Sequence, residues 1–296
     1  MNRMHWSVGL AGLLLASVAA AQDDDKPKAV DKAVAEKMLA SAEAVGSQVE
    51  DLTGRKFKQP VAKAVMTKDE LRHELAGMMQ KEYSGGKIER LEGWLRALGL
   101  FDGERDLQAT LTDVLLSQIG GFYDPARRSF FMMVESAAYG DVINQMMVAH
   151  ELCHALDDQY VDLRALQRPG GRDPTEDESY VVGGVVEGSA TALMFRWMAE
   201  AVKKGASVAD MSKMAEQQKD QMEVLLAAPP YCTLLAANYM VGHHFMTKGE
   251  GLPGMSGGGT AEDVMLEVAK QMPRSSEQLL HPDKYWKPDA RDEPVV

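Results

Sequence analysis

The sequence predicts a predominantly helical α+β domain with a small sheet. Long segments with helical periodicity alternate with Gly- and Pro-containing breaks, whereas β-type patterns are confined to two short segments. The chain has 296 residues, and 45% of them are hydrophobic. It is therefore long enough to bury a core, as one large domain or two small ones, and its composition is that of a folded protein.

The N-terminus has the pattern of a secretory signal peptide. Arg3 supplies a positive charge, residues 6–18 are apolar apart from two serines, and three alanines ending at Ala21 fit a cleavage site. We expect residues 1–21 to be removed before Gln22, which predicts a secreted or periplasmic protein. An uncleaved anchor is the alternative, but the apolar segment is short for a membrane span of about 20 residues.

The charge of the chain excludes some classes of partner. The formal net charge is −12, and no block of Lys and Arg offsets it. A chain this acidic repels nucleic acid and anionic lipid. No later segment is long and uncharged enough to cross a bilayer, so we expect no stable membrane span after signal cleavage. Cys153 and Cys232 allow one disulfide in an oxidising compartment, although the sequence does not decide whether they pair. The oligomeric state is also left open.

Residues 22–120 are expected to form an N-terminal, mainly helical region. After a charged leader, the region should contain a first helix, a strand, and then further helices, of which one starts at the capping box of Thr67 and Glu70. The expected ranges are a helix at 29–52, a strand at 57–66, and helices at 67–83, 88–98 and 106–118. The sequence leaves open whether this region is a separate domain or an inhibitory pro-segment.

Residues 121–296 are expected to form the second region, which carries the chemistry. A turn at Asp124 and Pro125 between two apolar segments predicts a β-hairpin. Two long helices should follow, separated by a Gly- and Pro-rich loop, with shorter helices at the end. The expected ranges are a hairpin at 121–134, helices at 141–160 and 179–203, a loop at 168–175 and a Gly-rich break at 249–259.

The segment His150-Glu151-Leu152-Cys153-His154 is the strongest chemical signal in the chain. Residues four apart on a helix lie about 40° apart around its axis, so both imidazoles point the same way and can bind one Zn²⁺. Glu151 stands beside them, where a carboxylate can act as a base toward metal-bound water. It is the only charged residue between 142 and 156, and an ionised carboxylate in so apolar a helix needs a positive partner.

A third ligand is needed, because a hydrolytic zinc site takes three protein ligands and keeps one position open. Glu187 is the only charged residue between 179 and 195, and small residues surround it. We therefore predict Glu187 as the third ligand. The alternative without a metal is a Glu whose carboxylate reaches solvent or pairs with a Lys. Glu176 and Glu178, in an acidic segment that we expect to be solvated, are the rival ligands.

These motifs resemble those of a known family. Residues 150–159 resemble the metal-binding helix of gluzincin-type metallopeptidases, the thermolysin-like clan, and residues 187–191 resemble the third-ligand helix of exported bacterial members. Segments 239–245 and 276–282 are also similar to that group. The resemblance implies a zincin-like fold, one zinc per chain and hydrolysis of a peptide or protein substrate. It also implies that the strand before the metal helix, here residues 130–134, binds an extended peptide.

Two departures from the family and several supporting residues complete the interpretation. Cys153 stands where Thr is common, and the gap from His154 to Glu187 is longer than in thermolysin. A tetrahedral intermediate needs a hydrogen-bond donor besides zinc. His281 is the preferred candidate for this catalytic role. The other candidates for the donor are Tyr239, His243 and His244.

Asp158 lies on the same helix face as the two histidines, so it could orient one of them, cap the helix or pair with a Lys. Cys153 points away from the metal-facing side and is expected to be buried and inert. The main alternatives to a peptidase are a zinc amide hydrolase acting on a cell-wall substrate and a non-catalytic exported metal-binding protein. Glu151 argues against the last, because a structural site needs no base beside its ligands.

Overall fold

The structure is a computed structural model of the chain, and it describes residues 32–82, 85–102, 106–139, 141–172, 174–205, 212, 219, 223–250 and 263–290. The predicted signal peptide, the leader and all but the first two residues of the predicted Gly-rich break at 249–259 lie outside the described residues. Within the part of the chain that is described, there is no helix that is both long and apolar enough to cross a membrane.

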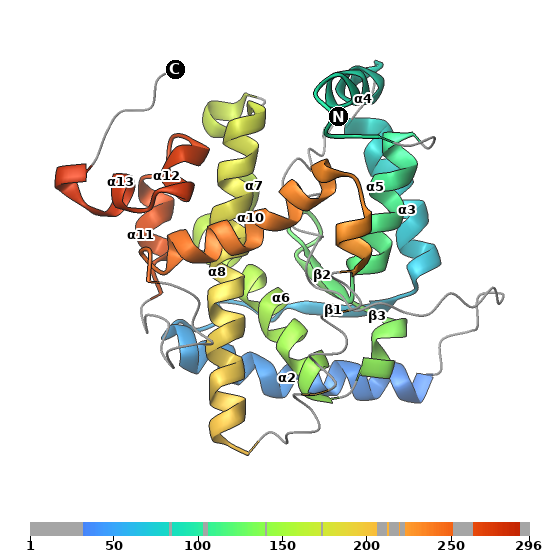
Figure 1. Cartoon of the computed structure of the whole chain (residues 1–296). Coiled ribbons are helices and arrows are strands. Elements are labelled where there is room, and N and C mark those ends of the chain that lie inside the picture. The colour runs from blue at the N-terminus through green and yellow to red at the C-terminus, as the bar shows by residue number, and fades with distance from the viewer. Residues whose placement is uncertain are drawn as a thin grey trace.

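The fold is mainly helical, with one small sheet at its centre (Figure 1), as the sequence predicted. The elements of the first region are α2 (Lys32–Thr53), β1 (Ala62–Met66), α3 (Lys68–Glu82), α4 (Lys87–Ala97) and α5 (Leu107–Gln118). The elements of the second region are β2 (Gly121–Asp124), β3 (Ser129–Met133), η1 (Val134–Tyr139), α6 (Asp141–Val161), α7 (Leu163–Leu166), η2 (Pro169–Gly171), α8 (Glu176–Lys203), α10 (Pro230–Met246), α11 (Met265–Lys270), α12 (Ser276–Leu280), α13 (Asp283–Trp286) and η3 (Pro288–Ala290).

The three strands lie in the order β1-β3-β2, with β1 parallel and β2 antiparallel to β3. The predicted hairpin is confirmed, because Gly121 pairs with Met132 and Asp124 with Ser129. The prediction that residues 130–134 form the peptide-binding edge is wrong. β3 is the central strand, so its backbone groups are already used by β1 and β2. The sheet edge beside the metal helix is β2, which packs against α6.

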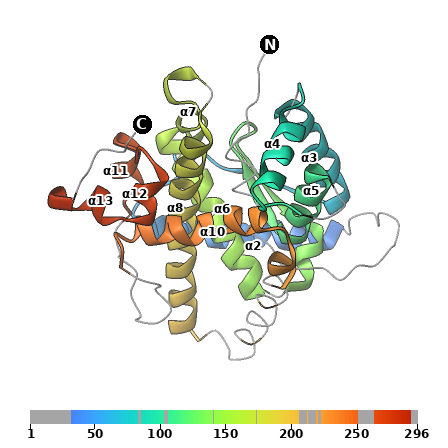
Figure 2. The same ribbon diagram turned by 45° about the horizontal axis from the view of Figure 1, so that its top comes forward.

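Contacts between the two regions are extensive. β1 belongs to residues 22–120 and pairs with β3 from residues 121–296, while α2 packs against α6 and α8. In Figure 2, α3, α4 and α5 form a group on one side of α6, α8 and α10, and α11 to α13 lie on the other side. The helices that carry the predicted ligands therefore run through the middle of the molecule.

α8 begins at Glu176, three residues earlier than predicted. Thr175 is its N-cap and makes a complete capping box with Glu178, which satisfies backbone N–H groups in the first turn. Further along, α10 crosses α8 at closest range through glycines. A Cβ at Gly188 would lie 2.3 Å from the backbone of Gly242, and one at Gly242 would lie 1.9 Å from the backbone oxygen of Gly184. Only glycine permits this crossing, which brings α10 against the ligand-bearing part of α8.

Candidate metal centre

The structure brings His150, His154 and Glu187 together in the interior. His150 and His154 project from α6, one turn apart, and Glu187 projects from α8. Their exposed fractions are 2%, 6% and 2%. Nε2 of His150 lies 3.1 Å from Nε2 of His154 and 3.1 Å from Oε2 of Glu187, and the third distance, from His154 Nε2 to Glu187 Oε2, is 3.4 Å. These buried side chains could hold a metal ion.

The spacing of the three atoms fits a small tetrahedral cation. Zn²⁺ with ligand bonds of about 2.0–2.1 Å in tetrahedral geometry sets neighbouring ligand atoms about 3.3 Å apart. The observed triangle, with edges of 3.1, 3.1 and 3.4 Å, is close to that size and nearly equilateral. Two imidazoles and one carboxylate are also a ligand set found in catalytic zinc sites. Both the donor chemistry and the geometry of these residues therefore fit zinc.

Glu151 lies beside the ligands with its carboxylate fixed by the sheet. It is 2% exposed, and Oε2 accepts a hydrogen bond of 2.8 Å from the backbone N–H of Tyr123 in β2. Burial raises the pKa of Glu151 to about 8, and nearby Glu187 adds to that increase, while His154 opposes it. A positive ion bound by the three ligand atoms would act against burial and favour the ionised carboxylate.

The ligands themselves carry perturbed proton affinities. Burial acts to lower the pKa of His154, but Glu187, with Glu151 and Asp157, outweighs it and raises this pKa to about 9. Burial lowers the pKa of His150. Burial acts to raise the pKa of Glu187, yet the two histidines hold this pKa below its usual value. Without a metal, the group therefore depends on a shared proton for its positive charge.

Tyr239 forms one wall of the centre. It lies on α10 with no exposed surface, and its ring stacks on that of His150 with centroids 6.1 Å apart and planes inclined by 23°. One turn later on α10, His243 is also fully buried and meets the ring of Phe195 edge-on at 5.2 Å. Of these two residues considered as donors from sequence, Tyr239 is the one in contact with a predicted ligand.

The remaining candidates lie elsewhere or make other contacts. His281 is an exposed residue at the end of α12, where its backbone N–H donates to Glu277 and its carbonyl accepts from Lys284. Its predicted role as a transition-state donor stays a prediction. Asp158 accepts from the Tyr123 hydroxyl at 2.9 Å and from the backbone N–H of Leu163 at 2.9 Å. It thus ties α6 to β2 and to α7.

The rival third ligands are placed in the first turn of α8. Glu176 is exposed, and Glu178 accepts from Arg172 and from the backbone N–H of Thr175. The two cysteines are both free and buried. Cys153 faces Asp157 and Ser189 at 3.8 and 3.9 Å, and burial raises the pKa of its thiol well above the usual value. Cys153 is therefore a poor nucleophile at neutral pH.

Sequence reasoning missed two features of the centre. The first is Tyr123, which contributes a backbone N–H to Glu151 and a hydroxyl to Asp158. A backbone donor leaves no trace in a sequence motif, since any residue but proline supplies it. The second is a cluster around Arg55, in which Asp157 and Ser189 link the two ligand-bearing helices. No local sequence pattern marks this cluster, because Arg55 and Asp157 are 102 residues apart.

Comparison of the chain with protein-family models, with curated proteins and with solved structures gave no match. Function is therefore inferred from the residues of the centre alone.

Proposed function

We propose that the protein is a zinc-dependent hydrolase of the zincin-like class that cleaves peptide bonds. The observation that carries the proposal is the joint geometry of His150, His154 and Glu187 with Glu151 next to them. The three ligand atoms are buried and 3.1–3.4 Å apart. The fourth residue is a carboxylate held in a fixed orientation by Tyr123. A site that serves structure alone has no use for such a base.

The chain's own residues supply proton transfer and orientation. Zinc, when bound, makes water acidic enough to attack at neutral pH and polarises a carbonyl group. Glu151 accepts the proton of the attacking water at its carboxylate and passes it to the leaving amine. The Tyr123 N–H keeps that carboxylate in one orientation throughout. The four residues of β2 leave little surface to solvent, and charges act more strongly where water is excluded.

A peptide is the proposed substrate because β2 is a sheet edge next to the base. Gly120 accepts a backbone hydrogen bond from Met133, and Tyr123 donates to Glu151. Since antiparallel strands alternate the direction of their backbone groups, Gly121 and Tyr123 direct theirs away from β3. The Tyr123 N–H is taken by Glu151, so the groups of this edge that are proposed to pair with a peptide are the Gly121 N–H and C=O and the Tyr123 C=O. Extended peptides add to sheet edges through such groups. The resemblance to gluzincins noted from the motif points to the same substrate class.

The test starts with the mature protein and zinc. Native mass spectrometry should show one zinc per chain, and the zinc-loaded protein should cleave members of a mixed peptide library. The Glu151→Gln variant should retain the zinc and lose activity by about 10²–10⁴-fold, because it keeps the shape but cannot accept the proton. A cell-wall peptide fragment, run in parallel, distinguishes an amide hydrolase from a general peptidase.

Each variant has its own contrary result. His154→Ala should lower the zinc affinity sharply, so full zinc retention in that variant would remove the ligand assignment. Wild-type hydrolysis rates in Glu151→Gln would remove the base. A wild-type protein that binds zinc but cleaves neither kind of substrate would support the non-catalytic metal-binding alternative.

A further inference from the structure

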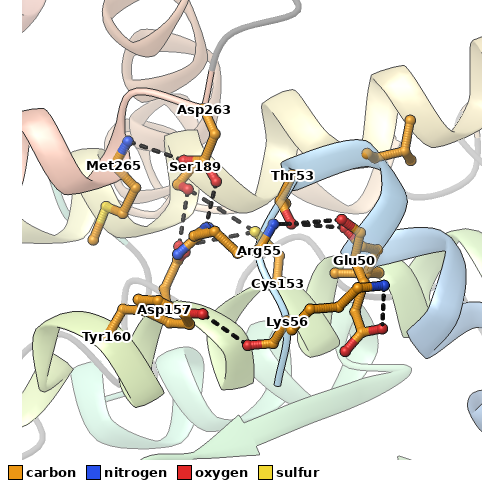
Figure 3. Close-up of polar contacts among 12 residues, drawn as sticks. Glu50, Thr53, Arg55, Lys56, Cys153, Asp157, Tyr160, Ser189, Asp263 and Met265 are labelled. Atoms are coloured by element: carbon orange, nitrogen blue, oxygen red, sulfur yellow. Dashed lines mark hydrogen bonds and ion pairs between the residues drawn. The ribbon is translucent and has the colours of Figure 1, made fainter. Parts of the chain in front are cut away.

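A second buried polar cluster lies behind the metal centre, and Arg55 is its hub (Figure 3). Arg55 follows α2 and is 8% exposed. Its Nη2 donates to Oδ1 of Asp157 on α6 at 2.6 Å, and its Nε lies 2.6 Å from Oδ2 of Asp263, just before α11. Asp157 has no exposed surface. One guanidinium thus joins the N-terminal region to the metal helix and to a C-terminal segment.

Asp157 also reaches the other ligand-bearing helix. Its second oxygen, Oδ2, accepts from the Ser189 hydroxyl of α8 at 2.9 Å. Asp157 follows the ligand His154 by three residues, and Ser189 follows the ligand Glu187 by two. The Asp157–Ser189 hydrogen bond therefore joins α6 to α8 within one helical turn of the metal ligands. Arg55 holds the first oxygen of the carboxylate, which leaves the second oriented toward α8.

The positions of Glu187 and Ser189 make them two separate supports of one helix. Residues two apart on a helix project about 200° apart around its axis. Around the helix axis, the side chain of Ala190 projects between the directions of Glu187 and Ser189. Ala190 belongs to the same buried cluster as Ala149 and Cys153 of α6. Glu187 therefore reaches α6 from one flank of this contact and Ser189 from the other. A rotation of α8 that lengthens the Ser189 contact also moves Glu187 relative to the two histidines.

Small rotations matter at this distance from the axis. Side-chain ends lie about 5–6 Å from a helix axis, so a rotation of 20° displaces them by about 2 Å. That displacement equals a whole zinc–oxygen bond. Packing of Ala190 alone does not resist rotation strongly, because a methyl group makes no directional contact. The hydrogen bond from Ser189 to Asp157 resists rotation, because a hydrogen bond weakens steeply when its distance and angle change.

We infer that Arg55, Asp157 and Ser189 are positioning residues that set the rotation of α8 and so the affinity of the metal centre. The inference rests on the proposed zinc site. None of the three side chains supplies a ligand atom. Arg55 fixes Asp157, Asp157 fixes Ser189, and Ser189 holds Glu187 at bonding distance from the histidines. The N-terminal region is thereby a working part of the metal centre.

The test is the zinc affinity of Ser189→Ala, which removes the hydroxyl and little else. We expect its dissociation constant for zinc, from competition with a chromophoric chelator, to rise about 10–100-fold, the range seen when partners of metal ligands are lost. Arg55→Lys keeps the charge but not the paired geometry, and should show a rise in the same direction. The visible spectrum of the Co²⁺-loaded variants should change, since the spectrum reports the coordination geometry.

Two further variants separate positioning from general stability. Ser189→Thr restores the hydroxyl, and Ser189 lines a cavity of about 20 Å³ together with Cys153 and Thr53, next to which an extra methyl group would be placed. It should recover the zinc affinity. Gln48→Ala is the matched control, because it removes another interhelical hydrogen bond of α8, the 2.5 Å bond from Trp197. It should lower the melting temperature of the metal-free protein as much as Ser189→Ala does, without changing the affinity.

Three outcomes would overturn the inference or the proposed zinc site on which it rests. If Ser189→Ala and Arg55→Lys bind zinc like wild type while their metal-free melting temperatures fall, the cluster is only structural and the inference is wrong. If Gln48→Ala weakens zinc binding equally, the effect belongs to stability and the inference is again wrong. If wild type itself fails to bind zinc, the proposed function fails first, and this measurement identifies that case.

Discussion

Two buried charged clusters lie a few residues apart on α6, and they differ in how their charges are balanced. In the Arg55 cluster, the guanidinium meets Asp157 and Asp263 directly, each at 2.6 Å. An arginine is positive at any pH that a protein survives. In the metal centre, the positive groups among the principal partners of Glu151 and Glu187 are histidines. Histidine is positive only while it holds a proton.

The Arg55 cluster is therefore an ion pair with a permanent positive charge, whereas the metal centre takes its positive charge from a proton or from a bound cation. In the Arg55 cluster the positive charge is permanent and belongs to the chain itself, so its removal is expected to lower the stability of the protein. The metal centre gains its positive charge from a proton on His154 or from a bound cation, and these compete. Burial alone therefore does not distinguish a ligand from a structural acid. The nature of the nearest positive group does.

The largest expected effect comes from breaking the buried ion pair between Arg55 and Asp157. Arg55→Met leaves Asp157 buried beside an apolar side chain, and loss of one partner of a buried pair costs about 3–5 kcal/mol. Chemical denaturation in the presence of a chelator should show this loss in the free energy of unfolding. Arg172→Met, which removes an exposed pair with Glu178, is the control and should cost far less, because solvent screens exposed pairs. Equal losses in the two variants would show that the buried Arg55–Asp157 pair contributes no more to stability than an exposed pair does.

The next largest effect is expected at the metal centre. Glu187→Gln removes a charge but keeps the volume, so the histidines lose their anionic partner and the cation loses a ligand. Zinc affinity should fall at least about 100-fold, the upper end of losses caused by residues that do not touch the metal. The metal-free protein should lose less free energy of unfolding than Arg55→Met does, because His154 can release its proton once Glu187 no longer carries a charge. Strong destabilisation of the metal-free variant would show that Glu187 acts as a structural acid.

The sequence predicted the metal centre better than its support. His150, Glu151 and His154 follow from spacing on one helix, and Glu187 follows from being an isolated charge in an apolar segment. Arg55 and Asp157 are 102 residues apart, and Asp157 next to Asp158 has no local feature that marks it as buried. Strand order was missed for a similar reason. Alternation predicts that residues 121–134 form a hairpin, but which strand is central depends on β1, far away in sequence.

A further effect tests a third case, a buried imidazole whose pKa is set by burial and by a neighbouring histidine. Burial, aided by His244, lowers the pKa of His243 to about 4, whereas an unfolded histidine titrates near 6.5. The unfolded state therefore binds more protons between pH 6.5 and 4, so stability present above pH 6.5 is lost as the pH falls through this window. The loss should amount to about 3 kcal/mol in the metal-free protein, since each pKa unit corresponds to about 1.4 kcal/mol.

A difference between variants isolates that contribution. His243→Gln lacks the titrating group, so its free energy of unfolding should fall less than that of wild type between pH 7 and pH 4. Parallel curves for wild type and His243→Gln would show that His243 is charged in the folded protein, as His154 is without metal.

The reach of Arg55 along the chain also sets an order of assembly. A ribosome makes Arg55 early, Asp157 much later, and Asp263 near the end. Until Asp263 has been synthesised, the guanidinium lacks one of its two carboxylates, and contacts between residues so far apart form late because the intervening loop must first be closed. Metal loading that depends on α8 being held in place therefore belongs to the completed chain. A nascent or C-terminally truncated chain would hold the two histidines on their helix without a settled third ligand.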